Sequence, residues 1–366
     1  MQITVQREAL LKPLGVVSGV VERRQTLPIL SNILLRHDGK SIFLTGTDLE
    51  VEITALVSGS GDSKTEMTIP ARKLYDICRA LPAEAELKIS FEKEKALVKS
   101  GKSRFRLLTM PASEFPSIET TQWDTTITVS QKQLRWLLEK TMFCMAQQDV
   151  RYYLNGLLLE VSTNRLRAVA TDGHRLSMAQ IDTTHPVDSE KQVILPRKGV
   201  QEMARFLEDT DEPVEIKIGA NHLRATLKNI TFTSKLIDGR FPDYNKVIPS
   251  NQSKKILVKR DIFRETLNRV AILSNEKYRG VRFGLNNDVM SITAHNPEQE
   301  EAQEDMSISY KGEEIEIGFN VNYISDAVTA IDADEVEFGL NDSNSSCLIC
   351  APGSTKHLYV VMPMRL

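Results

Sequence analysis

The feature that most constrains this chain is a pattern that occurs three times along it. A short strand-like segment that passes directly into a helical one begins at Thr4-Val5, at Thr128-Val129 and at Leu257-Val258. These starts are 124 and 129 residues apart. Because self-similarity at a fixed period indicates a repeated structural unit, we expect three copies of one fold.

Three further landmarks follow in the same order within each copy. An apolar strand ends in a polar turn, a second helix follows, and an apolar residue before a proline closes the copy. Proline is favoured at the first helical position, because it lacks the N–H that a helix would leave unpaired there. The turns lie at Asp48, Asp172 and Asn296, the second helices begin at Pro70, Pro196 and Phe319, and the closing pairs are Phe115-Pro116, Phe241-Pro242 and Met362-Pro363.

Each copy therefore reads as strand, helix, alternating strands, helix and further strands. The alternation of apolar and polar residues predicts antiparallel sheet with one covered face. The predicted fold class is α+β, with two helices packed on antiparallel sheets in each of three similar domains. The predicted domain boundaries are 1–122, 127–250 and 254–366.

Length and composition limit the number of domains and the cellular compartment that we expect. At 366 residues the chain is too long for one hydrophobic core. No apolar run is long enough to span a membrane, and the N-terminus alternates instead of resembling a signal peptide. The four cysteines are too few and too scattered for a disulfide framework. We expect a cytoplasmic protein with reduced thiols and no membrane partner.

The net charge of −3 hides a segregation of charge. The six predicted helical segments carry +8 together, which leaves −11 on the rest of the chain. Arg72-Lys73 and Arg197-Lys198 occupy first helical turns, where the helix dipole disfavours cations. Either the helices approach the phosphates of a nucleic acid, or they are ordinary solvated faces. Tyr152 and Tyr153 could likewise stack on bases or pack in a core.

The two ends of the chain also differ in charge. The segment 93–106 is rich in lysine and arginine, whereas the segment 298–305 is rich in acid residues. Such ends suit a head-to-tail contact between two copies, which closes into a ring if the rotation permits. Solvated charge runs are the alternative interpretation.

Signatures of catalysis are weak. The phosphate-binding loop, the nucleophile elbow and the zinc-protease motif are absent from the sequence, and Cys347 and Cys350 have no second pair with which to hold a metal. Asp172 and His174 could form the acid–base pair of an enzyme that acts on nucleic acid or nucleotides. They could equally be the turn of a hairpin in the second copy, since Asp-Gly between alternating apolar residues is a hairpin signal. A monomeric scaffold of repeats is a third interpretation.

Several motifs resemble the bacterial replicative sliding clamps, the beta subunits of DNA polymerase III, and they run from one end of the chain to the other. They are TLPILSNILL (26–35), QDVRYYLNG (148–156), ATDGHRL, PRKGV, FTSKLIDGRFPDY (232–244), LSNEKYRGVR (273–282), NPEQEEA and the terminal YVVMPMRL. The resemblance implies three domains of the DNA clamp fold and a homodimer closed head to tail into a ring. Double-stranded DNA would pass through its centre, which the helices would line.

The resemblance also implies partners and a non-enzymatic role without a cofactor. The ring would tether the alpha subunit of the replicative polymerase and would be loaded by a clamp loader through its delta subunit. Other polymerases and repair proteins would bind through short clamp-binding motifs. The cleft for these motifs would comprise Leu154, Thr171, Gly173, His174, Arg175, Leu176, Pro242, Lys246, Val247, Tyr278, Asn320, Tyr323, Ser346, Val360, Val361, Met362, Pro363, Met364, Arg365 and Leu366.

Two more surfaces follow from the resemblance. DNA contacts are expected at Arg24, Arg72, Gln148, Tyr152 and Tyr153, to which the charge pattern adds Arg197 and Lys198. The ring joint would set Lys73, Phe105 and Leu107 against Ile272, Leu273, Glu298, Glu300 and Glu301. The cleft departs from the family at Lys246, where arginine is frequent, and at Asn344, where a small apolar residue is usual. Lysine lacks the planar fork of arginine, so we expect a weaker contact at that rim.

Overall fold

The computed structural model describes residues 2–21, 27–92, 94–118, 122–185, 187 and 189–365. The chain divides into two compact units. The first comprises Met1–Arg135 and Lys198–Ile237, and the second comprises Trp136–Arg197 and Asp238–Leu366.

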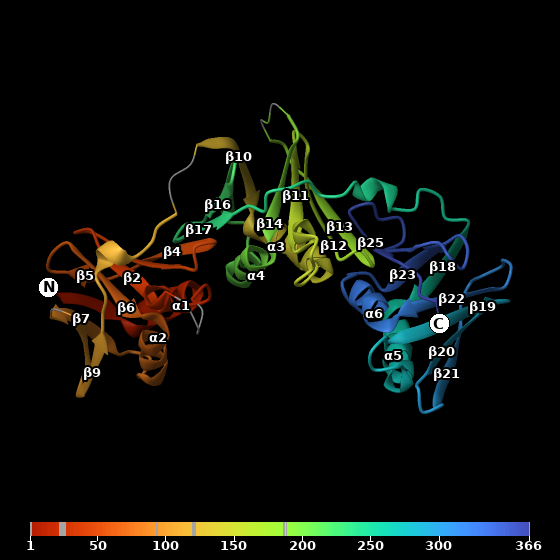
Figure 1. Ribbon diagram of the computed structural model, residues 1–366, viewed down its shortest axis with the longest axis horizontal. Helices are drawn as coiled ribbons and strands as arrows, with labels where there is room; N and C mark the ends of the chain where they lie inside the picture. The colour runs from red at the N-terminus through yellow and green to blue at the C-terminus, as the bar shows by residue number, and fades with distance from the viewer. Residues whose placement is uncertain are drawn as a thin grey trace. The chain divides into compact units, whose positions relative to one another are not determined.

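The same order of elements is repeated three times along the chain (Figure 1). The first copy holds β1 (Gln2–Gln6), α1 (Arg7–Val17), η1 (Pro28–Ser31), β2 (Asn32–His37), β3 (Ile42–Thr47), β4 (Val51–Val57), β5 (Ser60–Gly61), β6 (Thr65–Pro70), α2 (Ala71–Ala80), β7 (Glu86–Glu92), β8 (Lys95–Ser100), β9 (Ser103–Leu108) and η2 (Ala112–Glu114). The second holds β10 (Trp123–Ser130), α3 (Gln131–Thr141), η3 (Met142–Cys144), η4 (Tyr152–Leu154), β11 (Gly156–Ser162), β12 (Arg165–Thr171), β13 (Arg175–Asp182), β14 (Lys191–Pro196), α4 (Arg197–Phe206), β15 (Pro213–Gly219), β16 (His222–Thr226), β17 (Ile230–Lys235) and η5 (Tyr244–Lys246). The third holds β18 (Lys254–Lys259), α5 (Arg260–Val270), η6 (Ala271–Leu273), β19 (Gly280–Asn286), β20 (Val289–His295), β21 (Glu301–Ser307), β22 (Ile315–Asn320), α6 (Val321–Thr329), β23 (Glu335–Leu340), β24 (Cys347–Cys350) and β25 (His357–Val361).

Two copies contribute to each of the large sheets. In the first unit, one sheet has the order β5-β1-β7-β8-β9 and a second has the order β10-β15-β16-β17-β4-β3-β2-β6. In the second unit, the orders are β14-β11-β12-β13-β25-β24-β23-β18 and β21-β20-β19-β22. The halves of the eight-stranded sheets meet at the antiparallel pairs β17·β4 and β13·β25. Equivalent strands of successive copies therefore make the same contact twice.

The polar turn that marks each copy has a local chemical cause. In the first copy, Asp48 Oδ1 accepts hydrogen bonds from the N–H groups of Glu50 and Val51. Asp172 Oδ1 accepts the same pair of bonds in the second copy, from the N–H groups of His174 and Arg175. Because an aspartate side chain can satisfy backbone donors two and three residues ahead, the turn forms from neighbouring residues alone.

The predicted α+β class with three similar units is confirmed. In the first copy α1 lies beside α2, and in the third copy α5 lies beside α6 (Figure 1). In the third copy Phe263 packs against Phe338 with ring centroids 5.0 Å apart, and both rings are buried. The predicted helix starts were one residue early at Pro70 and Pro196, which end β6 and β14 immediately before the helices.

Candidate partner-binding cleft, DNA-facing residues and chain ends

The C-terminal tail forms one wall of the candidate cleft in the second unit. Strand β25 pairs with β13, so that Val361 lies opposite Arg175 and Val360 opposite Leu176. Met362 N then donates a 2.9 Å hydrogen bond to His174 O, and Met364 N donates a 2.8 Å bond to Gly318 O on β22. The tail thus runs from β25, an interior strand of one sheet, to β22, the edge strand of another.

The turn between β12 and β13 forms the adjoining wall. Gly173 adopts φ 88°, in the region that favours glycine. The Asp172 carboxylate caps the turn with one oxygen and accepts a 3.0 Å bond from Arg175 Nε with the other. Both carboxylate oxygens are therefore engaged, and no described bond joins them to the exposed His174 ring. The acid–base alternative for Asp172 and His174 is not favoured by this geometry.

Arg175 connects this turn to the third copy. Its Nη1 donates a 2.6 Å bond to Asp326 Oδ2 on α6, and its Nη2 donates a 2.8 Å bond to Phe143 O. The guanidinium also lies over the Tyr323 ring, 4.4 Å from its centroid, in a cation–π contact. The predicted cleft residues Arg175 and Tyr323 are therefore in direct contact.

The segment after β17 supplies Pro242, Lys246 and Val247, and a buried tyrosine anchors it. The Tyr244 hydroxyl donates to Glu160 on β11 and accepts a 2.6 Å bond from Arg167 Nη1 on β12. Burial, together with the bond to Glu160, raises the pKa of Tyr244 to about 12. Sequence reasoning missed Tyr244, because an aromatic residue in a connecting segment carries no signal of its partner.

The remaining cleft residues lie in the same unit. Asn320 caps α6 through bonds to the N–H groups of Asn322 and Tyr323, and its amide donates a 3.2 Å bond to Tyr278 O. Of the candidate cleft residues, Leu154, Leu176, Val360 and Val361 are buried, whereas Tyr278, Met362 and Arg365 are exposed. Thr171, Ser346, Pro363 and Met364 are half-buried. Leu366 lies outside the described residues.

The two departures from the family pattern are both exposed. Lys246 Nζ lies 3.4 Å from Asp243, with 81% of the side chain accessible. Asn344 occupies the turn between β23 and β24, where its N–H donates a 2.8 Å bond to Asp342. Neither residue is therefore among the buried residues of the candidate cleft.

Three of the candidate DNA-facing residues are exposed, namely Arg72, Gln148 and Tyr152. Gln148 has φ 56° and begins a loop in which Val150 is 95% exposed and Tyr152 58%. Tyr153 is half-buried, with its ring centroid 5.8 Å from that of Tyr152. In the first unit Arg72 is exposed on α2, whereas Arg24 lies outside the described residues.

Arg197 and Lys198 are engaged within the protein. Arg197 Nη1 donates a 2.8 Å bond to Met145 O. Lys198 Nζ lies 2.5 Å from Asp48 Oδ2 and donates a 3.3 Å bond to Val20 O. These neighbours offset the unfavourable position of two cations at the start of α4, so contacts within the protein are enough to stabilise both residues there.

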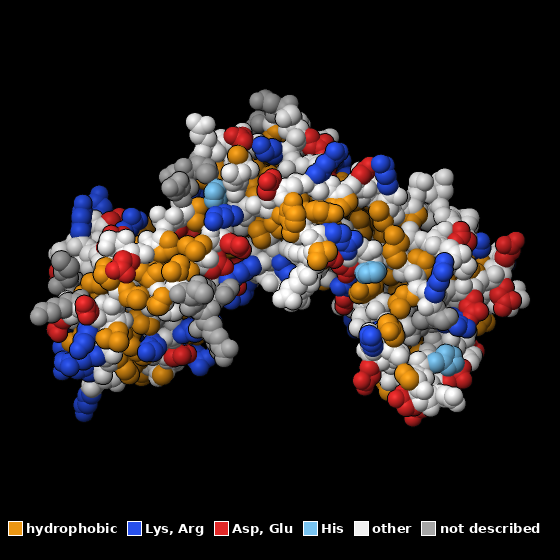
Figure 2. Space-filling model, in the orientation of Figure 1, with side chains coloured by type: hydrophobic (Ala, Val, Ile, Leu, Met, Phe, Trp, Pro, Cys, Tyr) orange, Lys and Arg blue, Asp and Glu red, His pale blue; other side chains and the backbone are white. Residues whose placement is uncertain are grey.

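The first and third copies each present an edge strand with one unpaired side. Phe105 and Leu107 lie on β9, at the edge of the first sheet, and Lys73 is exposed on α2. Glu301 begins β21, at the edge of the last sheet, directly after the exposed Glu298 and Glu300. Ile272 is 76% exposed on η6, beside Leu273. Figure 2 shows basic side chains gathered about β9 and acidic side chains about β21.

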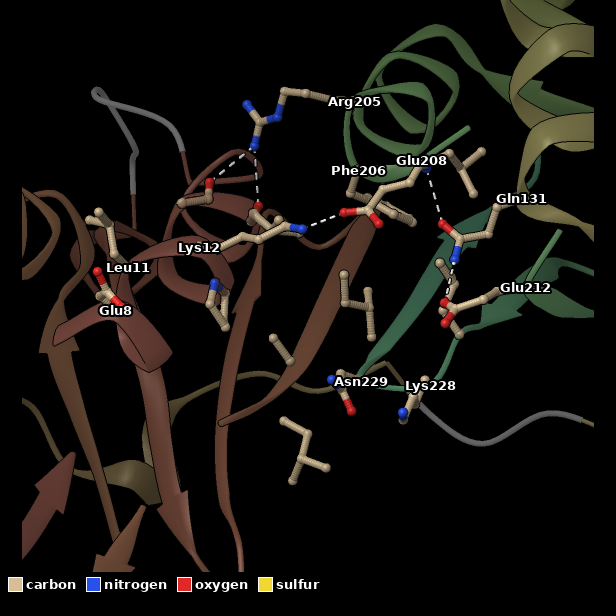
Figure 3. Close-up of a pocket in the computed structure, with 18 of the residues that line it drawn as sticks. Glu8, Leu11, Lys12, Gln131, Arg205, Phe206, Glu208, Glu212, Lys228 and Asn229 are labelled. Carbon is tan, nitrogen blue, oxygen red and sulfur yellow. Dashed lines mark hydrogen bonds and ion pairs between the residues drawn. The ribbon is translucent and has the colours of Figure 1, made fainter. Parts of the chain in front are cut away.

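A cavity of about 880 Å³ lies within the first unit, between α1 and α4 (Figure 3). Its floor is apolar and includes Ala55 and Ile230, while Lys12 and Glu208 form an ion pair across it. Arg205 Nη2 donates 3.2 Å bonds to the carbonyls of Gly15 and Val16 beside it.

The third copy contains two of the four cysteines. Cys347 and Cys350 are free and buried, and burial raises the pKa of each thiol. Among the helices of the described ranges, none has the length and apolarity that crossing a membrane requires.

The chain thus consists of three copies of one two-helix unit, with strand pairing that repeats from copy to copy and a free strand edge in the first and third copies. Models of the DNA polymerase III beta subunit match the chain throughout, with the N-terminal domain at residues 1–119, the central domain at 128–243 and the C-terminal domain at 245–365. The beta sliding clamps of Pseudomonas aeruginosa and Escherichia coli are 52% and 48% identical to it, each over 100% of both chains.

Solved structures agree with these relatives. A sliding clamp of Pseudomonas aeruginosa bound to griselimycin superimposes with a TM-score of 0.97 at 52% identity, and the beta subunit of Caulobacter crescentus with 0.94 at 38%, each with complete coverage of both chains. The chain belongs to the DNA polymerase III beta subunit family, the bacterial sliding clamps.

Proposed function

We propose that two copies of this chain close head to tail into a ring that encircles duplex DNA and tethers the replicative polymerase. The observation that carries this proposal is the strand pairing between copies. Strands β4 and β13 are equivalent and pair with the equivalent strands β17 and β25. Strand β21 is equivalent to β4 and β13, and β9 is equivalent to β17 and β25. Since β21 and β9 lack this partner within the described chain, each would pair with the other on a second subunit.

The internal pairs also predict the register of this joint. Phe105, Phe232 and Tyr359 occupy equivalent positions in their hairpins, as do Ala302, Ile53 and Ser177. Since Phe232 pairs with Ile53 and Tyr359 with Ser177, Phe105 would pair with Ala302 of the partner subunit. One step along, Arg106 would face Glu301 of the partner subunit.

Burial and charge support this joint. Phe232 and Tyr359 are buried because their strands are paired, whereas Phe105 remains half-buried at an open edge. An exposed edge with unpaired N–H and C=O groups is a template for strand addition. The predicted Arg106–Glu301 pair adds charge complementarity, with Lys73, Leu107, Ile272, Leu273, Glu298 and Glu300 beside it.

The further parts of the proposal concern DNA and partner proteins. Residues 1–122, 127–250 and 254–366 are the three domains, and they are linked by shared sheets. Arg24, Arg72, Gln148, Tyr152 and Tyr153 contact DNA, whose phosphates bind basic residues without regard to sequence. The alpha subunit of the polymerase, the delta subunit of the clamp loader, other polymerases and repair proteins bind the cleft. The protein acts in the cytoplasm, without a cofactor and without catalysis.

Retention on DNA tests topological binding. After loading, the clamp should remain on a nicked circular DNA and be lost when the circle is cut to a linear form. Equal retention on both forms would contradict a ring.

Charge reversal tests the register of the joint. Arg106→Glu and Glu301→Arg should each weaken the dimer in sedimentation, and a chain that carries both changes should recover it. Lys217→Glu, a charge reversal at a half-buried lysine of the interior strand β15, is the control. A double variant that stays monomeric would contradict the register.

A further inference from the structure

A second cavity adjoins the proposed cleft in the second unit. It has a volume of about 400 Å³ and lies against the β19–β20 hairpin. Tyr278, Met364 and Arg365 line it and also belong to the proposed cleft. Arg282, Thr293 and His295 line its far side and belong to neither the cleft nor the other proposed surfaces. The cavity is therefore a continuation of the cleft past the tail.

The floor of the cavity is a sheet face with little side-chain cover. In the strand register Arg282 lies between Thr293 on β20 and Gly318 on β22. Gly280 contributes to the lining, and Met364 is bonded to Gly318 at the edge. Gly280 on β19 and Gly318 on β22 have no side chain, so they leave space above the backbone that the tail borders but does not fill.

The walls suit an apolar side chain. The Tyr278 ring is 56% exposed, and the Lys277 ammonium lies 5.1 Å from its centroid. Met364 faces the same space, and an unbranched thioether adapts to apolar groups of different shape. An aromatic ring between Tyr278 and Met364 would be covered on two sides.

The arginines that line the cavity favour a ligand with an acidic residue next to the aromatic ring. The lining includes two arginines and no aspartate or glutamate. Arg282 Nη1 is 2.6 Å from Glu316 and is largely neutralised. Within the described part of the chain Arg365 has no ion-pair partner, so its charge is available to a ligand.

We propose that this cavity binds a flanking segment of partner peptides, namely an aromatic residue followed by an acidic one, next to the motif held in the cleft. The inference rests on the proposed cleft and adds a determinant of partner choice. Partners with this flank would bind more tightly than partners that carry the motif alone, and the difference would depend on residues outside the cleft.

The test compares three fluorescent peptides. One carries only the clamp-binding motif of the polymerase, and the other two add Phe-Asp before or after it. One extended peptide should bind the full-length protein about tenfold more tightly than the motif alone, as expected for burying one aromatic side chain. Thr293→Arg should remove this gain by filling the cavity, without changing the affinity for the motif alone.

Two controls make the outcome decisive. Val289→Arg places the same bulk on the same face of β20 outside the cavity, and it should leave the gain intact. Arg365→Ala should reduce the gain about threefold, through loss of the acidic contact. A gain that survives Thr293→Arg, or no gain for either extended peptide, would overturn the inference while leaving the cleft in place. Failure of the motif peptide itself to bind would overturn both.

Discussion

Arg175 Nη1 donates a 2.6 Å hydrogen bond to Asp326 Oδ2, and this bond joins β13 of the second copy to α6 of the third. The arginine side chain is only 13% exposed and also contacts Asp172, so the guanidinium holds the cleft turn and the helix together. A wall of the proposed cleft is therefore part of the junction between two copies.

Replacing Arg175 with alanine should destabilise this junction. We expect the free energy of unfolding to fall by about 2–3 kcal/mol, because Asp172 loses its partner in a poorly solvated site. Urea denaturation measures the change, and fluorescence titration should show weaker binding of the motif peptide. Arg79→Ala removes an exposed ion pair of 3.8 Å and should cost less than about 1 kcal/mol. Equal losses in the two variants would contradict the role of Arg175.

Gly173→Ala should distort the cleft turn. An added Cβ would lie 2.9 Å from Arg151 Nη1, and the positive φ costs a non-glycine residue about 1–2 kcal/mol. Thermal unfolding should show the loss, together with lower affinity for the motif peptide. Leu49 holds the equivalent turn of the first copy at φ 78°, so Leu49→Gly is the matched control. Its substitution should leave peptide affinity unchanged, and a loss of affinity there would contradict a specific effect at Gly173.

The cavity of the first unit can be filled by placing at position 12 the tryptophan that the second copy has at the equivalent helix position. Lys12 and Trp136 are each the sixth residue of an equivalent helix, α1 and α3. The Trp136 indole packs on His357, with ring centroids 5.7 Å apart, and His357 is equivalent to Ile230 in the cavity floor. An indole at position 12 should therefore enter the cavity.

Lys12→Trp should raise the free energy of unfolding by about 1 kcal/mol. The gain from burying the ring exceeds the loss of the exposed Lys12–Glu208 ion pair. Urea denaturation measures it, with Lys132→Trp as the control, because Lys132 is an exposed lysine outside the cavity lining. An equal change in both variants would show that the cavity does not accept the indole.

The repeat could be predicted from the sequence because its markers are local. Asp48 and Asp172 form their turns with residues two and three positions ahead, so spacing alone identifies them. The helix boundaries near Pro70 and Pro196 were misplaced by one residue. Proline at the end of a strand and proline at the first helical position look alike in sequence.

Contacts between distant segments could not be predicted in this way. Lys198 was predicted to contact DNA, and that stays a prediction, but its ion pair with Asp48, 150 residues away, carried no signal in the sequence. Tyr244 joins Glu160 and Arg167 through the fold alone. Long-range pairing depends on which strand edges meet, and no local pattern encodes that choice.

His357 should make the second unit less stable in acid. Burial lowers the pKa of this histidine, and the nearby Lys140 lowers it further, while Asp332 opposes the shift. The unfolded chain then takes up a proton near the ordinary histidine pKa of about 6.5, before the folded protein does. The folded state is therefore not penalised by His357 above that pH. As the pH falls toward the lowered pKa, the free energy of unfolding decreases, because only the unfolded chain is protonated. Urea denaturation between about pH 7.5 and pH 5 should show a smaller decline for His357→Gln than for the wild type. His174→Gln, at an exposed site, should follow the wild type, and parallel declines in all three proteins would exclude His357 as the source.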